Sequence, residues 1–262
     1  MSPRRKAEKD VLARIPSMRG GIDKRTVKDL VSEKLESLIA SGVLRPGDEL
    51  PGERELASAF SVSRETLRGA VQGLAARGLL EVSHGARTRV RDADLGLLRI
   101  GMTIPGKINS YDIEAVHGAR LLVERAVVRD AATKIDAATL GRLKDSLVAQ
   151  RATMTDPVRF LICDREFHVA IYRSAANPLL ADFVTDLYAY MMDYRRRAVS
   201  LPGAIRRSYE DHVAIVEALE AGDADAVDAA FAHHLDRIYA TTRSLIDGSR
   251  LAAAGDPEPP AI

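Results

Sequence analysis

The stretch from Leu50 to Val90 constrains the fold of this chain more than any other part of the sequence. It opens with a short helical pattern, and Ser61-Val62-Ser63 then has the composition of a tight turn. Ser63 is suited to cap a second helix. The apolar face of that helix is formed, at helical spacing, by Leu67, Ala70, Val71 and Leu74. Two short helices joined in this way are typical of a helix-turn-helix.

Two short strand patterns follow the second helix. Gly78 ends the helix, and the segments 79–82 and 87–90 flank a turn at His84-Gly85. A hairpin in this place can act as a wing that reaches the minor groove beside a DNA-reading helix. The sequence therefore predicts a winged helix-turn-helix.

Polar side chains at the start of the second helix point away from its apolar face. Arg64, Thr66 and Arg68 hold these positions. Arginine pairs with guanine through two hydrogen bonds in the major groove, so a helix that begins in this way is suited to reading base edges.

The run LRPGDELPGERELASAFSVSRETLRGAV resembles the DNA-binding module of GntR-type bacterial transcription regulators. In that family, arginines after the Leu-Pro, after the turn serine and four residues further on contact DNA. They correspond to Arg54, Arg64 and Arg68 here. The wing tip His84-Gly85 is similar to that of FadR-type members. Departures from the family pattern, which concern the operator sequence and the wing contacts, occur at Gly52, Gly69 and 86–88.

Charge divides the chain into a basic N-terminal part and an acidic C-terminal part. Residues 1–91 carry 18 Lys+Arg and 12 Asp+Glu, whereas the remainder carries 20 and 25. The basic part suits a nucleic-acid binder. The single cysteine, Cys163, excludes internal disulfides and a cysteine-rich zinc site. No apolar run reaches the roughly 18 residues of a membrane span, and the charged start is no secretory signal, so we expect a cytoplasmic protein with no membrane partner.

Composition also predicts the domain boundaries. Residues 1–22 are expected to be a flexible arm, 23–91 the winged helix-turn-helix domain and 92–110 a glycine-containing linker. Residues 111–250 predict an antiparallel all-α bundle of six to seven helices, and 251–262 a frayed tail. The fold class is therefore mainly α. Breaks in the helical patterns place six bundle helices at roughly 111–134, 137–154, 157–175, 178–199, 205–221 and 224–247.

Four polar residues of the predicted bundle fall on inward helix faces. Asp164 and His168 are four residues apart, so they share one face of a helix, while His212 and His234 lie on two later helices. One carboxylate and three imidazoles could therefore meet from three helices. Zinc accepts this ligand set, as do nickel and manganese, with positions left for another oxygen donor. Since neutral histidine is the binding form, we expect metal occupancy to fall as the histidines protonate near pH 6.

Each of these residues also has an ordinary interpretation. A single histidine is more often a hydrogen-bonded core or surface residue, and Asp164 alone is most simply a solvated charge or the partner of an arginine. The coincidence of all four on inward faces favours a metal site. Arg173 and the arginines at 195–197 could also reach a pocket, although the run at 195–197 is more simply a solvated face. The tyrosines at helical spacing, Tyr172 and Tyr188 among them, predict core residues.

The C-terminal half resembles the FCD effector-binding domain of FadR-type GntR regulators. Asp164-x-x-x-His168, the Asp-His pair at 211–212 and His234-Leu235 match its metal-ligand pattern, and the segment 177–180 matches a further signature. The resemblance implies that residues 111–250 bind an effector and form a homodimer. Arg120 corresponds to an arginine that engages a carboxylate ligand in metal-binding members. Its competing role is an ion pair with Glu124, at i,i+4 spacing.

Taken together, these features predict a dimeric, metal-containing transcription repressor that binds a palindromic operator in double-stranded DNA and responds to a small carboxylate. One alternative is a metal-dependent enzyme, because such metals with open positions also generate hydroxide. No acidic residue is clearly placed as a general base, so we expect no enzyme activity. In a further alternative, the metal only stabilises the bundle.

Overall fold

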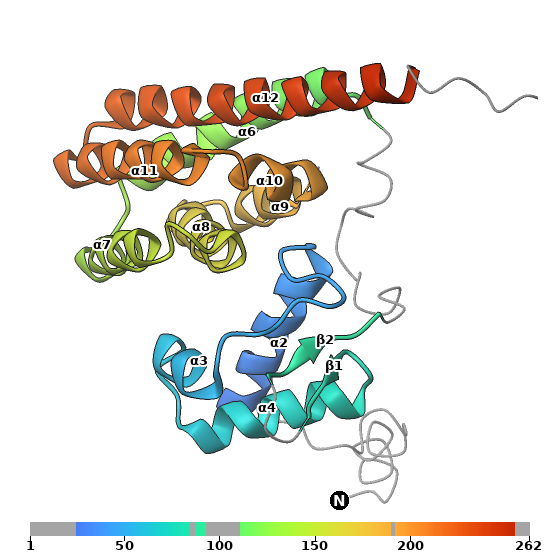
Figure 1. Cartoon of the computed structure of the whole chain (residues 1–262). Coiled ribbons are helices and arrows are strands. Elements are labelled where there is room, and N and C mark those ends of the chain that lie inside the picture. Colours follow the sequence, from blue (N-terminus) through green and yellow to red (C-terminus); the bar gives the residue numbers. More distant parts are fainter. Residues whose placement is uncertain (1–24, 84–86, 93–110, 190–191, 255–262) are drawn as a thin grey trace, which may run out of the picture.

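The computed structural model describes residues 25–83, 87–92, 111–189 and 192–254. In these segments, the helical patterns of the sequence form a small N-terminal head and a larger helical bundle (Figure 1). The prediction of a mainly α fold, with a winged helix-turn-helix followed by an all-α bundle, is confirmed.

The described part of the head contains three helices and a two-stranded sheet. Helix α4 (Arg64–Ala76) packs against α2 (Val27–Ala40) and α3 (Glu53–Ala59). Strand β1 (Leu80–Glu81) pairs with β2 (Arg89–Val90) in an antiparallel register. Both strands are shorter than predicted.

The boundaries of α4 follow from the residues at its two ends. Ser63 accepts a hydrogen bond from the backbone N–H of Thr66 at 3.0 Å, so it caps the helix as predicted. Gly78 lies beyond the helix with a φ of 79°, a left-handed conformation that glycine adopts without steric cost. Leu67 and Leu74, on the inner face, have no exposed surface. Burial of this face therefore holds α4 against the rest of the head.

The bundle helices begin at local sequence signals. The side chains of Asp112, Asp136, Asp156 and Asn177 each accept a backbone N–H from the first turn of the helix that follows. The helix predicted at 178–199 is in fact two helices. In the described residues the bundle consists of α6 (Ile113–Ala132), α7 (Ala137–Ala152), α8 (Pro157–Tyr172), α9 (Pro178–Tyr188), α10 (Met192–Val199), α11 (Ala204–Ala221) and α12 (Ala224–Ala254).

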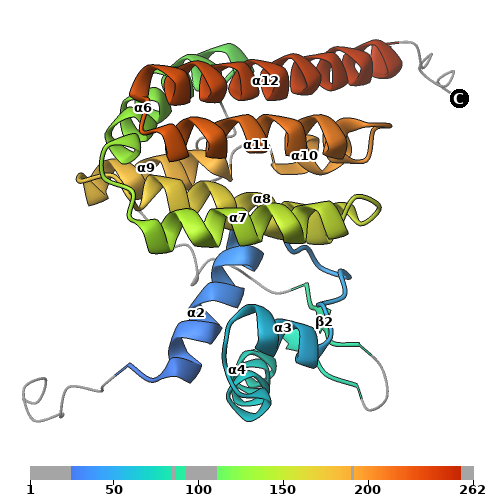
Figure 2. The same ribbon diagram turned by 90° about the vertical axis from the view of Figure 1, so that its left-hand side faces the viewer.

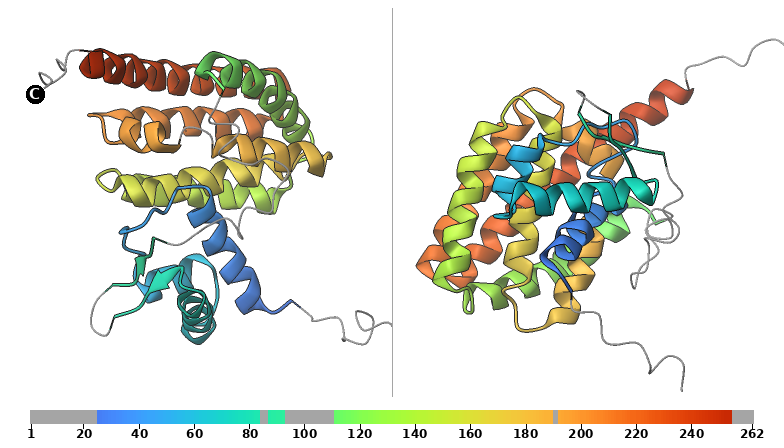
Figure 3. Two further views of the ribbon diagram at one scale, coloured as in Figure 1. Left: turned by 90° about the vertical axis from the view of Figure 1, so that its right-hand side faces the viewer. Right: turned by 90° about the horizontal axis from the view of Figure 1, so that it is seen from below.

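These helices lie in three tiers above the head (Figure 2). The tier of α6 and α12 is farthest from the head, the tier of α9, α10 and α11 is in the middle, and α7 and α8 are nearest to it. The same separation of head and bundle is seen from the opposite side (Figure 3). Phe167, Ile215 and Phe231 are fully buried between the tiers. Among the described residues, no helix combines the length and the apolar character that a membrane crossing requires.

The head and the bundle share an apolar seam. Leu161 of α8, Tyr188 of α9 and Met192 of α10 belong to the same buried cluster as the core of the head. At the edge of this cluster, Arg165 of α8 donates a hydrogen bond to Oγ of Ser37 in α2 at 2.6 Å. Helix α8 therefore packs against both the core of the bundle and the head.

Candidate metal centre and DNA-binding surface

The arginines predicted to contact DNA lie on the exposed side of the head. Arg54, Arg64 and Arg68 are all exposed. Arg68 pairs with Glu53 at 3.3 Å, but its side chain is 61% exposed, so the ion pair is weak and leaves the guanidinium available. The hydroxyl of Thr66 lies 2.8 Å from Oγ of Ser63 and is engaged in the helix cap. Base reading by these side chains stays a prediction.

A surface groove of about 440 Å³ runs between the two short helices and the hairpin. Glu53 and Arg68 line one side of the groove, and Val82 and Arg87 line the other. A basic residue on each side suits the phosphate backbone of DNA. The predicted wing tip, His84-Gly85, lies outside the described residues.

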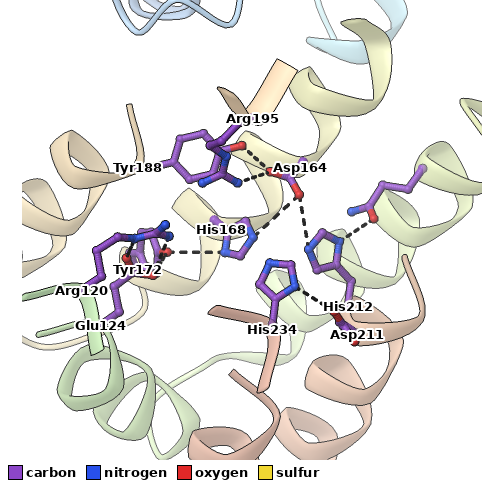
Figure 4. A network of polar contacts seen from close by, with 11 residues as sticks. Arg120, Glu124, Asp164, His168, Tyr172, Tyr188, Arg195, Asp211, His212 and His234 are labelled. Carbon is purple, nitrogen blue, oxygen red and sulfur yellow. Dashed lines mark hydrogen bonds and ion pairs between the residues drawn. The ribbon is translucent and has the colours of Figure 1, made fainter. Parts of the chain in front are cut away.

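The four predicted metal ligands come together in the centre of the bundle. Helix α8 supplies Asp164 and His168, α11 supplies His212 and α12 supplies His234 (Figure 4). Each offers one ligand atom, and these atoms lie within 4.8 Å of one another. The four residues are at most 2% exposed. Small inward movements of the side chains would close this cluster on one ion.

Further hydrogen bonds fix the orientation of the imidazole rings. Nδ1 of His212 lies 2.7 Å from Oε1 of Gln150, and Nδ1 of His234 lies 3.2 Å from Oδ2 of Asp211. Both partners are acceptors, so each Nδ1 carries the ring proton and each Nε2 keeps a free lone pair. This is the tautomer that a metal-binding histidine needs.

His168 is held in the same way from the other side of the site. Its Nδ1 lies 3.4 Å from the hydroxyl of Tyr172, which donates its own proton to Glu124 at 2.7 Å. Burial and the Glu124 carboxylate raise the pKa of Tyr172 well above its usual value, so this hydroxyl remains a donor. The buried Nε2 atoms of all three histidines have no hydrogen-bond partner among the described residues. Such buried atoms need an explanation, and a metal ion provides one.

Asp164 uses its two carboxylate oxygens differently. Oδ2 accepts hydrogen bonds from the hydroxyl of Tyr188 and from Arg195, the latter at 3.1 Å. Oδ1 faces Nε2 of His212 at 3.4 Å and is therefore free to bind a metal. Burial alone would raise the pKa of Asp164, but the charge of Arg195 and the hydrogen bond from Tyr188 act against burial, and the pKa lies below its ordinary value. The carboxylate is thus ionised, as a metal ligand must be.

Burial argues against titration of His168 and His212 near pH 6. Loss of solvation, together with the charge that His234 would carry, lowers the pKa of His212 to about 3. The same causes lower the pKa of His168 well below its ordinary value. Both rings are therefore neutral at pH 6, in the form that binds a metal. The sequence could not show this, because the shift depends on full burial.

Arg120 lies behind His168 and forms the ion pair with Glu124. Its Nε donates to Oε1 at 2.5 Å and its Nη2 to Oε2 at 3.4 Å. Because Glu124 also accepts from Tyr172, this pair supports the hydrogen bond to His168 (Figure 4). One of the two predicted roles of Arg120 is therefore present in the structure, and its contact with an effector stays a prediction.

Two residues of the site were not singled out by the sequence. The run 195–197 was expected to be a solvated face, with a pocket as its alternative, and Arg195 takes the alternative: it is only 5% exposed, and its guanidinium carbon lies 4.0 Å from the centre of the Tyr188 ring. No sequence signal separates it from its neighbours. Gln150, in contrast, follows Leu143 and Leu147 at helical spacing, so its inward position could have been inferred.

A cavity of about 60 Å³ adjoins the metal cluster. It lies between α8, α10, α11 and α12, and Asp164 and His234 contribute to its lining. Arg195, Arg207 and Arg237 also line it. Two candidate metal ligands and three arginines therefore face a space that suits a small anion.

Comparisons with known proteins cover both halves of the chain. Residues 28–90 match the model of the gntR family of bacterial regulatory proteins, and residues 115–237 match the FCD domain. The HTH-type transcriptional repressor NanR of Cronobacter sakazakii is 31% identical over 85% of this chain and 87% of its own. The NanR repressor of an Enterobacter species is 29% identical, over 87% and 89% of the two chains. Among solved structures, E. coli McbR/YncC aligns with a TM-score of 0.51 at 20% identity, over 85% of this chain and 100% of that chain, which supports the fold.

Proposed function

The chain belongs to the GntR family of bacterial regulatory proteins, with an FCD domain behind its DNA-binding head, and on this premise we propose a repressor that is controlled by a small carboxylate bound at a divalent metal ion. It is a DNA-binding transcription regulator, like its relatives, and not an enzyme.

The metal part of the proposal rests on the Nε2 atoms of His168, His212 and His234, which have no hydrogen-bond partner among the described residues. They are buried, they face the free oxygen of Asp164, and their tautomers are fixed by acceptors on the opposite ring nitrogen. Zinc fits three imidazoles and one carboxylate, and nickel or manganese would fit as well. The adjoining cavity lets an oxygen donor from a carboxylate complete the coordination. Arg120 does not line this cavity, so its predicted contact with the effector would require Arg120 to leave the ion pair with Glu124.

The DNA part of the proposal rests on the head. Arg64 and Arg68 lie at the start of α4, where base edges of the major groove are within reach, and Arg54 lies on α3, where a phosphate contact is expected. One recognition helix covers too few base pairs for useful specificity. A homodimer that places two heads on a palindromic operator supplies the second half-site.

Elemental analysis and native mass spectrometry of the purified protein test this proposal. We expect one metal ion per chain and a co-purifying acid. Operator affinity would be measured on a duplex selected from a random pool, with and without that acid. A protein without stoichiometric metal, even after metal re-addition, would contradict the metal site. If the metal-loaded protein binds the operator with the same affinity in the presence and in the absence of every acid tested, the metal has a structural role only.

A further inference from the structure

Two consecutive arginines of α10 contact different parts of the molecule. Arg195 is buried beside the metal cluster and donates through Nη2 to Oδ2 of Asp164 at 3.1 Å. Its Nη1 is also buried, but it has no hydrogen-bond partner among the described residues. Because Arg195 lines the cavity, a ligand there can supply the missing acceptor.

The charges around the cavity favour a negatively charged ligand. Glu124 is paired with Arg120, and Asp211 accepts from His234 and pairs with Arg237 at 3.3 Å. Asp164 is then left to balance both Arg195 and a divalent ion. A buried excess of positive charge is costly, and a carboxylate in the cavity would reduce it. The cavity of about 60 Å³ is small, which favours a small acid.

Arg196, the next residue, contacts the head. Its Nη1 donates to the backbone carbonyl of Val43 at 2.5 Å, and its guanidinium pairs with Asp48 at 2.9 Å. Asp193 of the same helix forms an ion pair with Arg45 in the head. These contacts lie in the loop between α2 and α3, directly before the DNA-reading helices. A short helix thus links the cavity to the head without an intermediate element.

We propose that Arg195 is the carboxylate-binding arginine of the effector site, and that α10 transmits effector binding to the head through Arg196. The effector carboxylate accepts a hydrogen bond from Arg195. This contact changes the hydrogen bond between Arg195 and Asp164, and with it the position of α10. Because Arg196 joins Val43 and Asp48 of the head to α10, a change in the position of α10 also changes the arrangement of the head. This inference rests on the proposed function, since it names residues of the same effector site.

The test compares three substitutions in the same helix: Arg195→Met, Arg196→Met and, as a matched control, Arg197→Met, which removes the same charge from an exposed position. Each full-length protein would be loaded with cobalt(II), whose visible spectrum reports on its ligands. It would then be titrated with acetate, lactate, malate and citrate. Affinity for a duplex selected with the wild-type protein would be measured with and without the acid that binds best.

We expect Arg195→Met to hold one cobalt ion per chain but to bind the acid at least tenfold more weakly. Arg196→Met should bind the acid within about twofold of wild type, yet lose the acid-dependent change in duplex affinity. Arg197→Met should match wild type in both assays. Arg195→Lys keeps the charge but not the bidentate geometry, so its affinity for the acid should lie between those of wild type and Arg195→Met. This variant replaces Arg195→Met in the test if the Met variant does not fold.

Each failure has a distinct meaning. Unchanged acid binding in a folded Arg195 variant would overturn the role of Arg195, while an intact DNA response in Arg196→Met would overturn the role of α10. A wild-type protein that takes up cobalt but binds none of the four acids would instead refute the proposed effector, and this inference with it.

Discussion

Replacing Gln150 with leucine tests the proposed control of the metal centre by a residue that never touches the metal. Oε1 of Gln150 accepts the Nδ1 proton of His212 at 2.7 Å, and Gln150 has no exposed surface. Leucine has a similar volume but no acceptor, so Nδ1–H of His212 would be buried without a partner. Loss of such a partner typically weakens metal binding by about 10- to 100-fold, which corresponds to about 1.4–2.7 kcal/mol. The metal-free protein should also lose about 1–3 kcal/mol of unfolding free energy.

Competition with a zinc-binding indicator at pH 7.5 would measure the affinity, and thermal unfolding with and without zinc would measure the stabilisation by metal. Gln150→Glu is the matched variant, because a carboxylate accepts the same proton and should keep or raise the affinity. Ser146→Ala is the second control, since the Ser146 hydroxyl accepts from the amide nitrogen of Gln150 at 3.3 Å and not from the Oε1 atom that faces His212. If a folded Gln150→Leu protein binds zinc as tightly as wild type, the tautomer of His212 is not set by Gln150 and the reasoning is wrong.

Four further predictions concern other parts of the chain. His212→Ala should lose the metal and the response to carboxylate while DNA is still bound, as elemental analysis and duplex titrations would show; retention of both would remove His212 from the site. Arg68→Ala should cost about 1–3 kcal/mol on the operator and relax its sequence preference, whereas Arg54→Ala should weaken operator and random duplex alike. Sedimentation should find a dimer whose half-sites are centred within about one helical turn, and a monomer that binds one half-site at full affinity would contradict this. Burial raises the pKa of Cys163 to about 11, so its alkylation by iodoacetamide at pH 8 should be far slower than that of a free thiol; equal rates would show the thiol to be accessible.

The fold could be predicted because its signals are local. Ser63 and Gly78 fix the ends of α4 by their own capping and backbone chemistry, and the aspartates that begin the bundle helices act within one turn. The division of the segment 178–199 into α9 and α10 was missed. The sequence between Tyr188 and Met192 contains no proline or glycine, so helical periodicity alone could not reveal this division.

The candidate site could be predicted only in part. The spacing of the ligands is visible in the sequence, whereas the hydrogen-bond partners that orient them are brought near only by folding. Asp164 and His168 are four residues apart on one helix, which a sequence displays directly. Two of the partners that orient the rings lie far away in the sequence: Gln150 is 62 residues from His212, and Asp211 is 23 residues from His234. Which acceptor meets these two rings depends on how α7, α11 and α12 pack. Full burial, which sets the pKa of His212, likewise exists only in the folded bundle.

The position of α8 would allow the proposed metal and effector site to act on the head over a short distance. One side of this helix carries Asp164 and His168 into the metal cluster, and the adjacent side carries Leu161 and Arg165 into the seam with the head. A change in the side-chain positions on the first face therefore acts on a helix that already contacts α2 through Ser37. Tyr188 adds a second direct connection, since its hydroxyl donates to Asp164 while its ring belongs to the buried cluster of the head. Coupling between the two sites needs no chain of intermediate residues, because the residues that hold the metal ligand also build the seam.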